Sequence, residues 1–121
     1  MSRPLMVKHD ETVSSVEHFQ QVFALAQQLS GLGVAIYEHH WDFLTFGSWT
    51  IVAGSRHRRF EFCWDGREFS ISVSQCEFSD SRSHQHWSAP KTQILPSDDP
   101  SAPFQYVEQF FKQEPQRLTN R

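Results

Sequence analysis

The fold is decided by residues 47–75, whose sequence is GSWTIVAGSRHRRFEFCWDGREFSISVSQ. Large apolar residues alternate here with polar ones, which is the pattern of strands that bury one face. The dipeptide Asp65-Gly66 is typical of a two-residue type I′ hairpin turn, because both central positions of that turn need a positive φ. A second loop at 54–57 separates the first two apolar runs. We therefore expect a three-stranded antiparallel meander.

The two turns together predict which residues the meander buries. Each turn assigns the same large apolar side chains to one face, where they meet across the strands. The expected cross-strand pairs are Phe62 with Phe69, Phe60 with Ile71, Ile51 with Phe60, and Trp49 with Phe62. The opposite face is hydrophilic apart from one cysteine, and it carries Ser48, Thr50, Arg59, Glu61, Cys63, Glu68, Ser70, Ser72 and Ser74.

Two amphipathic helices are expected to flank this sheet. Residues 14–17, SSVE, match the S-x-x-E capping box, whose side chains bond the backbone amides at a helix start. Apolar residues then recur at helical spacing as far as Gly31, namely Val16, Phe19, Val22, Phe23, Ala26 and Leu29. A second helix is expected after Pro103 and before Pro115, with an apolar stripe of Phe104, Val107, Phe110 and Phe111.

The remaining segments complete the expected architecture. Residues 33 to about 41 are expected to form a strand before the meander, and 84–87 a fifth strand after it. The proline-rich segment 88–102 is expected to be an extended linker, and the ends 1–11 and 116–121 to be flexible. The chain of 121 residues is thus predicted to be a single α+β domain. It is a two-layer sandwich, in which an antiparallel meander sheet of four to five strands carries both helices on one face.

Composition limits the classes of function. The net charge is −3, which argues against nucleic-acid binding, because that binding needs a clustered excess of Lys and Arg. Apolar runs are too short for a secretory segment or a membrane span, so a cytoplasmic protein is expected. Cys63 and Cys76 are predicted to be unpaired, because the expected hairpin separates them by about 26 Å along the strands.

The hydrophilic sheet face is the expected binding surface. Its short side chains make it flat, which suits a protein partner better than a small ligand. The chain is therefore predicted to be a non-enzymatic protein-binding module, such as an inhibitor, an immunity-type protein or a chaperone-type partner, without a cofactor. The residues expected to bind are Arg59, Glu61, Thr50, Ser70, Ser72 and Trp41. A homodimer is an open alternative for the partner.

A metal-independent phosphodiesterase or ribonuclease is the alternative function. Glu61 would act as the base and Arg59 would stabilise the charge on the phosphorane. His84 or His86 would protonate the leaving oxygen.

A metal-binding protein is the second alternative. The H-x-H pair His84 and His86 lies beside Cys76 if residues 79–83 form a hairpin. Imidazole and thiolate ligands suit zinc. Only three ligands can be named, and a structural zinc site has four.

Overall fold

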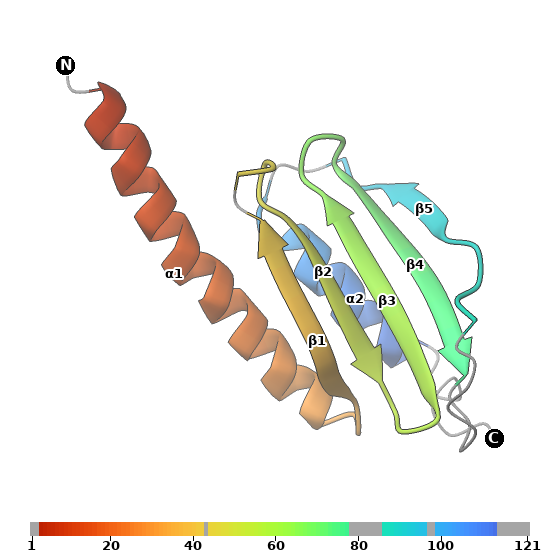
Figure 1. Ribbon diagram of the computed structural model, residues 1–121. Coiled ribbons are helices and arrows are strands. Elements are labelled where there is room, and N and C mark those ends of the chain that lie inside the picture. The colour runs from red at the N-terminus through yellow and green to blue at the C-terminus, as the bar shows by residue number, and fades with distance from the viewer. Residues whose placement is uncertain (1–2, 43, 78–85, 97–98, 114–121) are drawn as a thin grey trace.

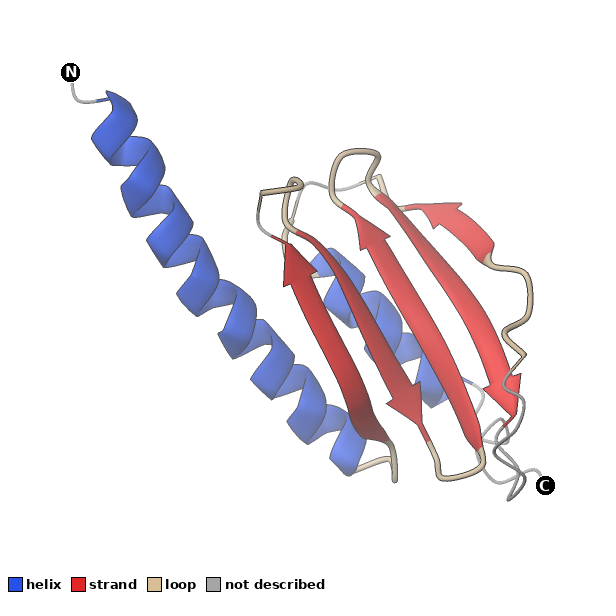
Figure 2. Ribbon diagram, in the orientation of Figure 1, coloured by secondary structure: helices blue, strands red, loops and turns tan. Residues whose placement is uncertain are grey.

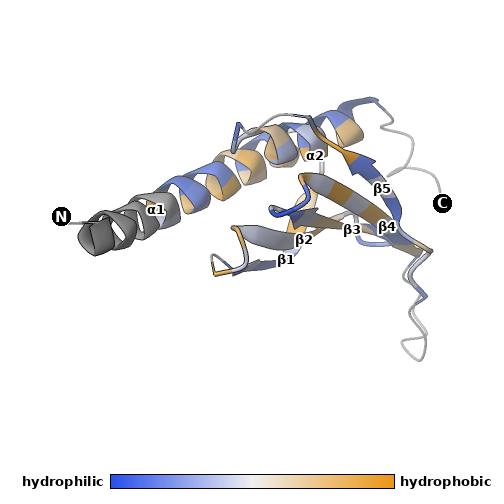
Figure 3. Cartoon of the chain, turned by 90° about the horizontal axis from the view of Figure 1, so that it is seen from above, coloured by the Kyte–Doolittle hydropathy of each residue, from blue (hydrophilic) through white to orange (hydrophobic). Residues whose placement is uncertain are grey.

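The computed structural model describes residues 3–42, 44–77, 86–96 and 99–113, with side chains described from Ser15 onward. The elements in chain order are α1 (Arg3–Ser30), β1 (Ala35–Asp42), β2 (Ser48–Gly54), β3 (Arg58–Asp65), β4 (Ser70–Glu77), β5 (Lys91–Ile94) and α2 (Ala102–Gln113). The strands form one antiparallel sheet in the order β1-β2-β3-β4-β5 (Figures 1 and 2). Both helices lie on the same side of this sheet (Figure 3), so the predicted α+β meander is confirmed.

The core lies between the sheet and α2. Phe60 and Phe62 of β3 are fully buried, and the ring of each lies in a T-shaped arrangement with those of Phe110 and Phe111 of α2, with centroids 5.0–5.7 Å apart. The apolar stripe predicted for α2 is therefore confirmed. The buried core comprises Leu25, Leu29, Val34, Trp49, Ile51, Ala53, Phe60, Phe62, Ile71, Phe104, Val107 and Phe111.

The hairpin between β2 and β3 has a register different from the predicted one. Ile51 lies opposite Phe62, and Trp49 lies opposite Trp64, a shift of two residues. Ser55 causes this shift: its N–H donates to the Arg58 carbonyl at 2.8 Å, and its Oγ accepts the Arg58 N–H at 3.2 Å. Because the shift is even, every side chain stays on its predicted face.

The hairpin between β3 and β4 also differs, and the predicted two-residue turn is wrong. Its loop is 66–69, and Phe62 lies opposite Val73 rather than Phe69. The Asp65 carboxylate opens the turn by accepting the N–H groups of Arg67 at 2.9 Å and Glu68 at 3.2 Å, an Asx-type arrangement. The shift is again even, so the buried face of β4 is preserved while Phe69 leaves the sheet.

Helix α1 differs from its prediction in both start and orientation. It begins at Arg3, so the capping-box start at residue 14 is wrong, while the flexibility expected of 1–11 stays a prediction. It lies along the edge of the sheet against β1 and α2 (Figure 1), so only a narrow stripe is buried. That stripe contains His18, Leu25 and Leu29, whereas three residues of the predicted stripe, Val16, Phe19 and Phe23, are exposed by 54%, 54% and 65%.

The segment after β4 contains a strand where a linker was expected. β5 pairs with β4, and the hydroxyls of Ser72 and Thr92 lie 3.1 Å apart. His86 and Trp87 have no regular secondary structure, so a fifth strand at 84–87 is wrong for these two residues. His84 and the expected flexible end 116–121 lie outside the described residues. Neither helix, over its described residues, has the length and apolar character to cross a membrane.

Candidate aromatic binding site

The residues predicted to bind are divided between the two faces of the sheet. Arg59 and Glu61 lie on the outer face, away from the helices, together with Thr50, Ser70 and Ser72. The Arg59 guanidinium carbon lies 3.7 Å from the centroid of the Tyr37 ring, which orients this cation. Trp41 lies on the inner face, opposite Trp49, and so is not part of the same surface.

The predicted catalytic group is only partly described. Arg59 and Glu61 lie two positions apart on β3, and neither lines the cavities described between the sheet and the helices. The backbone of His86 forms a hydrogen bond with the Cys76 thiol. His84 is outside the described residues. The catalytic group therefore stays a prediction.

The predicted metal ligands stay a prediction as well. No group of three or more His, Cys, Asp or Glu side chains within the described ranges could hold a metal ion, and these ranges lack His84. Cys76 is buried, and burial raises the pKa of its thiol. The two cysteines are unpaired, as predicted.

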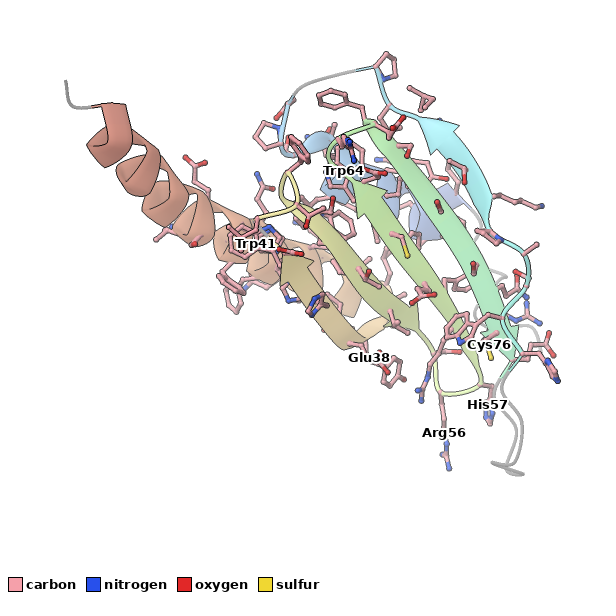
Figure 4. All side chains as sticks on the ribbon, turned by 45° about the horizontal axis from the view of Figure 1, so that its top comes forward. Glu38, Trp41, Arg56, His57, Trp64 and Cys76 are labelled. Atoms are coloured by element: carbon pink, nitrogen blue, oxygen red, sulfur yellow. The ribbon has the colours of Figure 1, made fainter. Side chains whose placement is uncertain are left out.

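A cavity of about 670 Å³ opens between α1 and one end of the sheet. Three tryptophans on adjacent strands form its wall, because Trp41 lies directly opposite Trp49, and Trp49 directly opposite Trp64. Figure 4 shows Trp41 and Trp64 at the same end of the sheet, with Arg56 and His57 at the other. We call this cavity the aromatic pocket. It is lined by Glu17, His18, Gln20, Gln21, Ala24, Trp41, Phe46, Gly47, Trp49, Trp64, Gly66, Phe69, Asp99, Pro100 and Phe104.

Two phenylalanines at the mouth of the pocket have unusual backbone angles. Phe46 and Phe69 have φ values of 56° and 53°, and among the described residues they are the non-glycine residues with positive φ. Their side chains are nonetheless 65% and 42% exposed. A positive φ at a bulky residue destabilises the folded state, and these exposed rings gain little from burial to offset it. Such strain is typical of ligand sites.

Gly66 lies at the contact between the loops 44–47 and 66–69, which carry Phe46 and Phe69. A Cβ at this position would overlap the carbonyl oxygen of Phe46. The Gly66 N–H also donates to the Ser48 Oγ at 3.0 Å. Because φ of Gly66 is not positive, its glycine is required by this close approach and not by the turn type that the sequence suggested.

His18 forms the inner wall of the pocket on the α1 side. Its ring stacks on Trp41 with centroids 4.3 Å apart, and its Nε2 lies 2.8 Å from the Nε2 of His39. Burial, and then the proximity of His39, lower the pKa of His18 from 6.5 to about 4. The pKa of His39 is lowered as well, by burial and then by His40. His18 is therefore uncharged at neutral pH.

The polar groups of the pocket are carboxylates and amides. Glu17, Gln20 and Gln21 come from α1, and Asp99 comes from the segment before α2. Asp99 Oδ1 accepts the N–H and the Oγ–H of Ser101, both at 2.9 Å, and these bonds lower the pKa of Asp99. No lysine or arginine is among the lining residues.

Comparisons of the chain with protein-family models, with curated proteins and with solved structures found no match.

The sequence contained one signal for this site. In the true register Trp41, Trp49 and Trp64 align across three strands, whereas the predicted register paired Trp49 with Phe62. The two-residue error hid the alignment, and only Trp41 was named as a binding residue. Phe46, Phe69, His18 and Asp99 join the pocket through loop and helix positions that no local pattern indicates.

The buried His18 makes stability depend on pH. Its folded pKa is below its unfolded value, so the unfolded chain binds the extra proton first. Stability is therefore retained above about pH 6.5 and is lost as the pH falls toward 4. We expect a loss of about 2 kcal/mol between about pH 7 and pH 5 from this group. Urea unfolding across this range measures it.

Two variants isolate the contribution of His18. The first is His18→Gln, in which the part of the pH slope that comes from this ring disappears, and the second is Leu32→Asn, which removes no titratable group and serves as the control. An unchanged slope in His18→Gln would assign the dependence to other groups, of which His39 is the nearest.

Proposed function

We propose that the protein is a small non-catalytic binding module that docks another polypeptide on the aromatic pocket and the apolar side chains around it. The observation that carries this proposal is the pair of strained, exposed phenylalanines, Phe46 and Phe69, at the mouth of a pocket walled by three tryptophans. Pockets of this size with a few polar groups are typical ligand sites.

The exposed apolar surface next to the pocket favours a polypeptide over a small molecule. Gln20 lines the pocket, and its neighbours on the surface of α1 are Val16 and Phe23, four residues before and three after it. Both are more than half exposed, as is Phe46 across the mouth. A small ligand would fill the pocket and leave this rim in water, whereas a polypeptide can cover both.

The outer sheet face is the second candidate docking surface, as the sequence predicted. The observation in its favour is the stacking of Arg59 on Tyr37, which prepares the guanidinium to pair with a carboxylate of a partner. Neither helix covers this face (Figure 3). Short polar side chains such as that of Ser72 lie on it.

Photo-crosslinking in the native cell distinguishes the two surfaces. Benzoylphenylalanine is placed at Phe69 for the pocket, at Ser72 for the outer face, and at Leu32 as a control. Leu32 is similarly exposed, at 38%, and follows α1 away from the pocket. We expect one polypeptide to be crosslinked from position 69 and not from 32. Crosslinks from 72 alone would move docking to the outer face, and none from either would contradict the proposal.

Substitutions then measure the affinity for the purified partner. Phe46→Asn and Phe69→Asn remove the rings. Asparagine tolerates the positive φ of both positions, so the fold is expected to persist. We expect each to weaken binding by about tenfold or more, with no effect of Leu32→Asn or Arg59→Glu. Loss of binding in Arg59→Glu with normal binding in Phe69→Asn would contradict docking at the pocket.

A further inference from the structure

We infer that the group entering the aromatic pocket is the cationic side chain of an arginine or lysine on the docked polypeptide. This inference rests on the proposed function and adds the chemistry of the anchor. It comes from three features of the pocket: its aromatic wall, the sign of its charges, and the behaviour of a guanidinium already present at its rim.

The wall offers the negative faces of several π-systems. Trp41, Trp49 and Trp64 are aligned across β1, β2 and β3, and Phe46 and Phe69 stand at the mouth. A cation within about 6 Å of such a ring is attracted by its quadrupole, most strongly by tryptophan. Phe104 stacks on Trp49 at 4.8 Å, and His18 stacks on Trp41 at 4.3 Å, so each of these two indoles has one face covered. Trp64 is therefore the main candidate for the contact.

The charges that face the pocket have one sign. Glu17 and Asp99 line it from opposite elements, and no lysine or arginine does. His18 is the remaining titratable group of the lining; its partner His39 lies behind it, and both rings are neutral at pH 7. The amide oxygens of Gln20 and Gln21 can accept hydrogen bonds from the N–H groups of a cation. The charged side chains that line the pocket therefore favour a cation over an anion.

The rim already attracts a guanidinium of the same chain. The Arg67 guanidinium carbon lies 5.7 Å from the centroid of the Phe46 ring. Arg67 does not line the pocket, but its positive charge lies at the mouth and opposes the entry of a second cation. This predicts effects of opposite sign: removing an acidic group of the pocket weakens binding, and removing Arg67 strengthens it.

Matched pairs of small probes test the inference. N-acetyl-arginine N-methylamide is compared with its neutral analogue N-acetyl-citrulline N-methylamide, and the lysine derivative with that of norleucine. Dissociation constants are measured by titrating the tryptophan fluorescence. We expect each cationic probe to bind about fivefold more tightly than its neutral partner. Equal or tighter binding of the neutral probes, or no binding of any probe up to its solubility limit, would overturn the cationic anchor.

Variants of the chain test the predicted direction of each change in affinity. Glu17→Gln and Asp99→Asn are expected to weaken binding of the arginine probe about twofold to fivefold, and Arg67→Gln to strengthen it by a similar factor. Asn keeps a side-chain oxygen that can accept the two hydrogen bonds from Ser101, and melting temperatures check that each variant is folded. The same direction of change in Glu17→Gln and Arg67→Gln would overturn the inference.

The crosslinking experiment separates this inference from the proposed function. A partner crosslinked at Phe69 whose binding is insensitive to Glu17→Gln, with equal affinities for the arginine and citrulline probes, would preserve the docking site and refute the cationic anchor. Absence of any crosslinked partner, together with selective binding of the cationic probes, would refute polypeptide docking and leave a site for a free organic cation.

Discussion

Phe62→Ala is expected to lower the free energy of unfolding by about 3–5 kcal/mol, because it empties a fully buried position and the cavity cannot close. The lost contacts are with Ile51, opposite Phe62 on β2, and with the rings of Phe110 and Phe111 at 5.2 and 5.7 Å. Urea unfolding of the wild type and the variant measures the difference.

The matched control for this change is Phe69→Ala. The sequence-based register pairs these two phenylalanines on the buried face, so it predicts that truncating either one destabilises the fold. In the structure Phe69 is outside the sheet and 42% exposed, so its truncation is expected to cost less than about 1 kcal/mol. A loss below about 1 kcal/mol for Phe62→Ala would mean that the core is wrongly assigned, and equal losses for both would restore the predicted register.

Gly66→Val is expected to destabilise the fold by about 2–3 kcal/mol or more, the typical cost of forcing atoms into a filled space. Its Cβ would overlap the Phe46 carbonyl oxygen, which is backbone and cannot rotate away. The loops 44–47 and 66–69 must then separate, and the hydrogen bond from Gly66 to Ser48 is strained. Thermal and urea unfolding measure the loss.

Gly31→Ala is the control for glycine replacement. A Cβ at Gly31 would lie 3.5 Å from the Gln28 carbonyl oxygen, an ordinary contact, and its φ is not positive. We expect a change within about 0.5 kcal/mol of zero. If Gly66→Ala were as harmless as Gly31→Ala, the close approach of the two loops would be refuted.

The sequence predicted the sheet and its buried face because those depend on alternation, which survives an error in register. Both hairpins are shifted by even numbers of residues, so Phe60, Phe62 and Ile71 are buried as expected. The pattern did not predict the lengths of the turns. The first loop is shortened to 55–57, where Ser55 bonds Arg58, and the second is lengthened to 66–69, where the Asp65 carboxylate accepts two backbone N–H groups.

Helix α1 shows where local pattern is insufficient. Its apolar residues repeat at helical spacing, yet the helix lies at the sheet edge and buries His18 while leaving Phe19 and Phe23 in water. Which stripe is buried depends on where the helix docks, a tertiary choice that periodicity does not encode. The same choice creates the aromatic pocket, so the site could not be predicted until the register of the sheet and the position of α1 were known.

The four indole N–H signals in a ¹H–¹⁵N NMR spectrum test the central claim most directly. Trp41, Trp49 and Trp64 line the pocket, and Trp87 does not. On titration with N-acetyl-arginine N-methylamide, we expect a saturable shift of the Trp64 signal, smaller shifts for Trp41 beneath His18 and for Trp49 beneath Phe104, and none for Trp87. A saturable shift of Trp87 with the three pocket signals unchanged would contradict binding in the aromatic pocket.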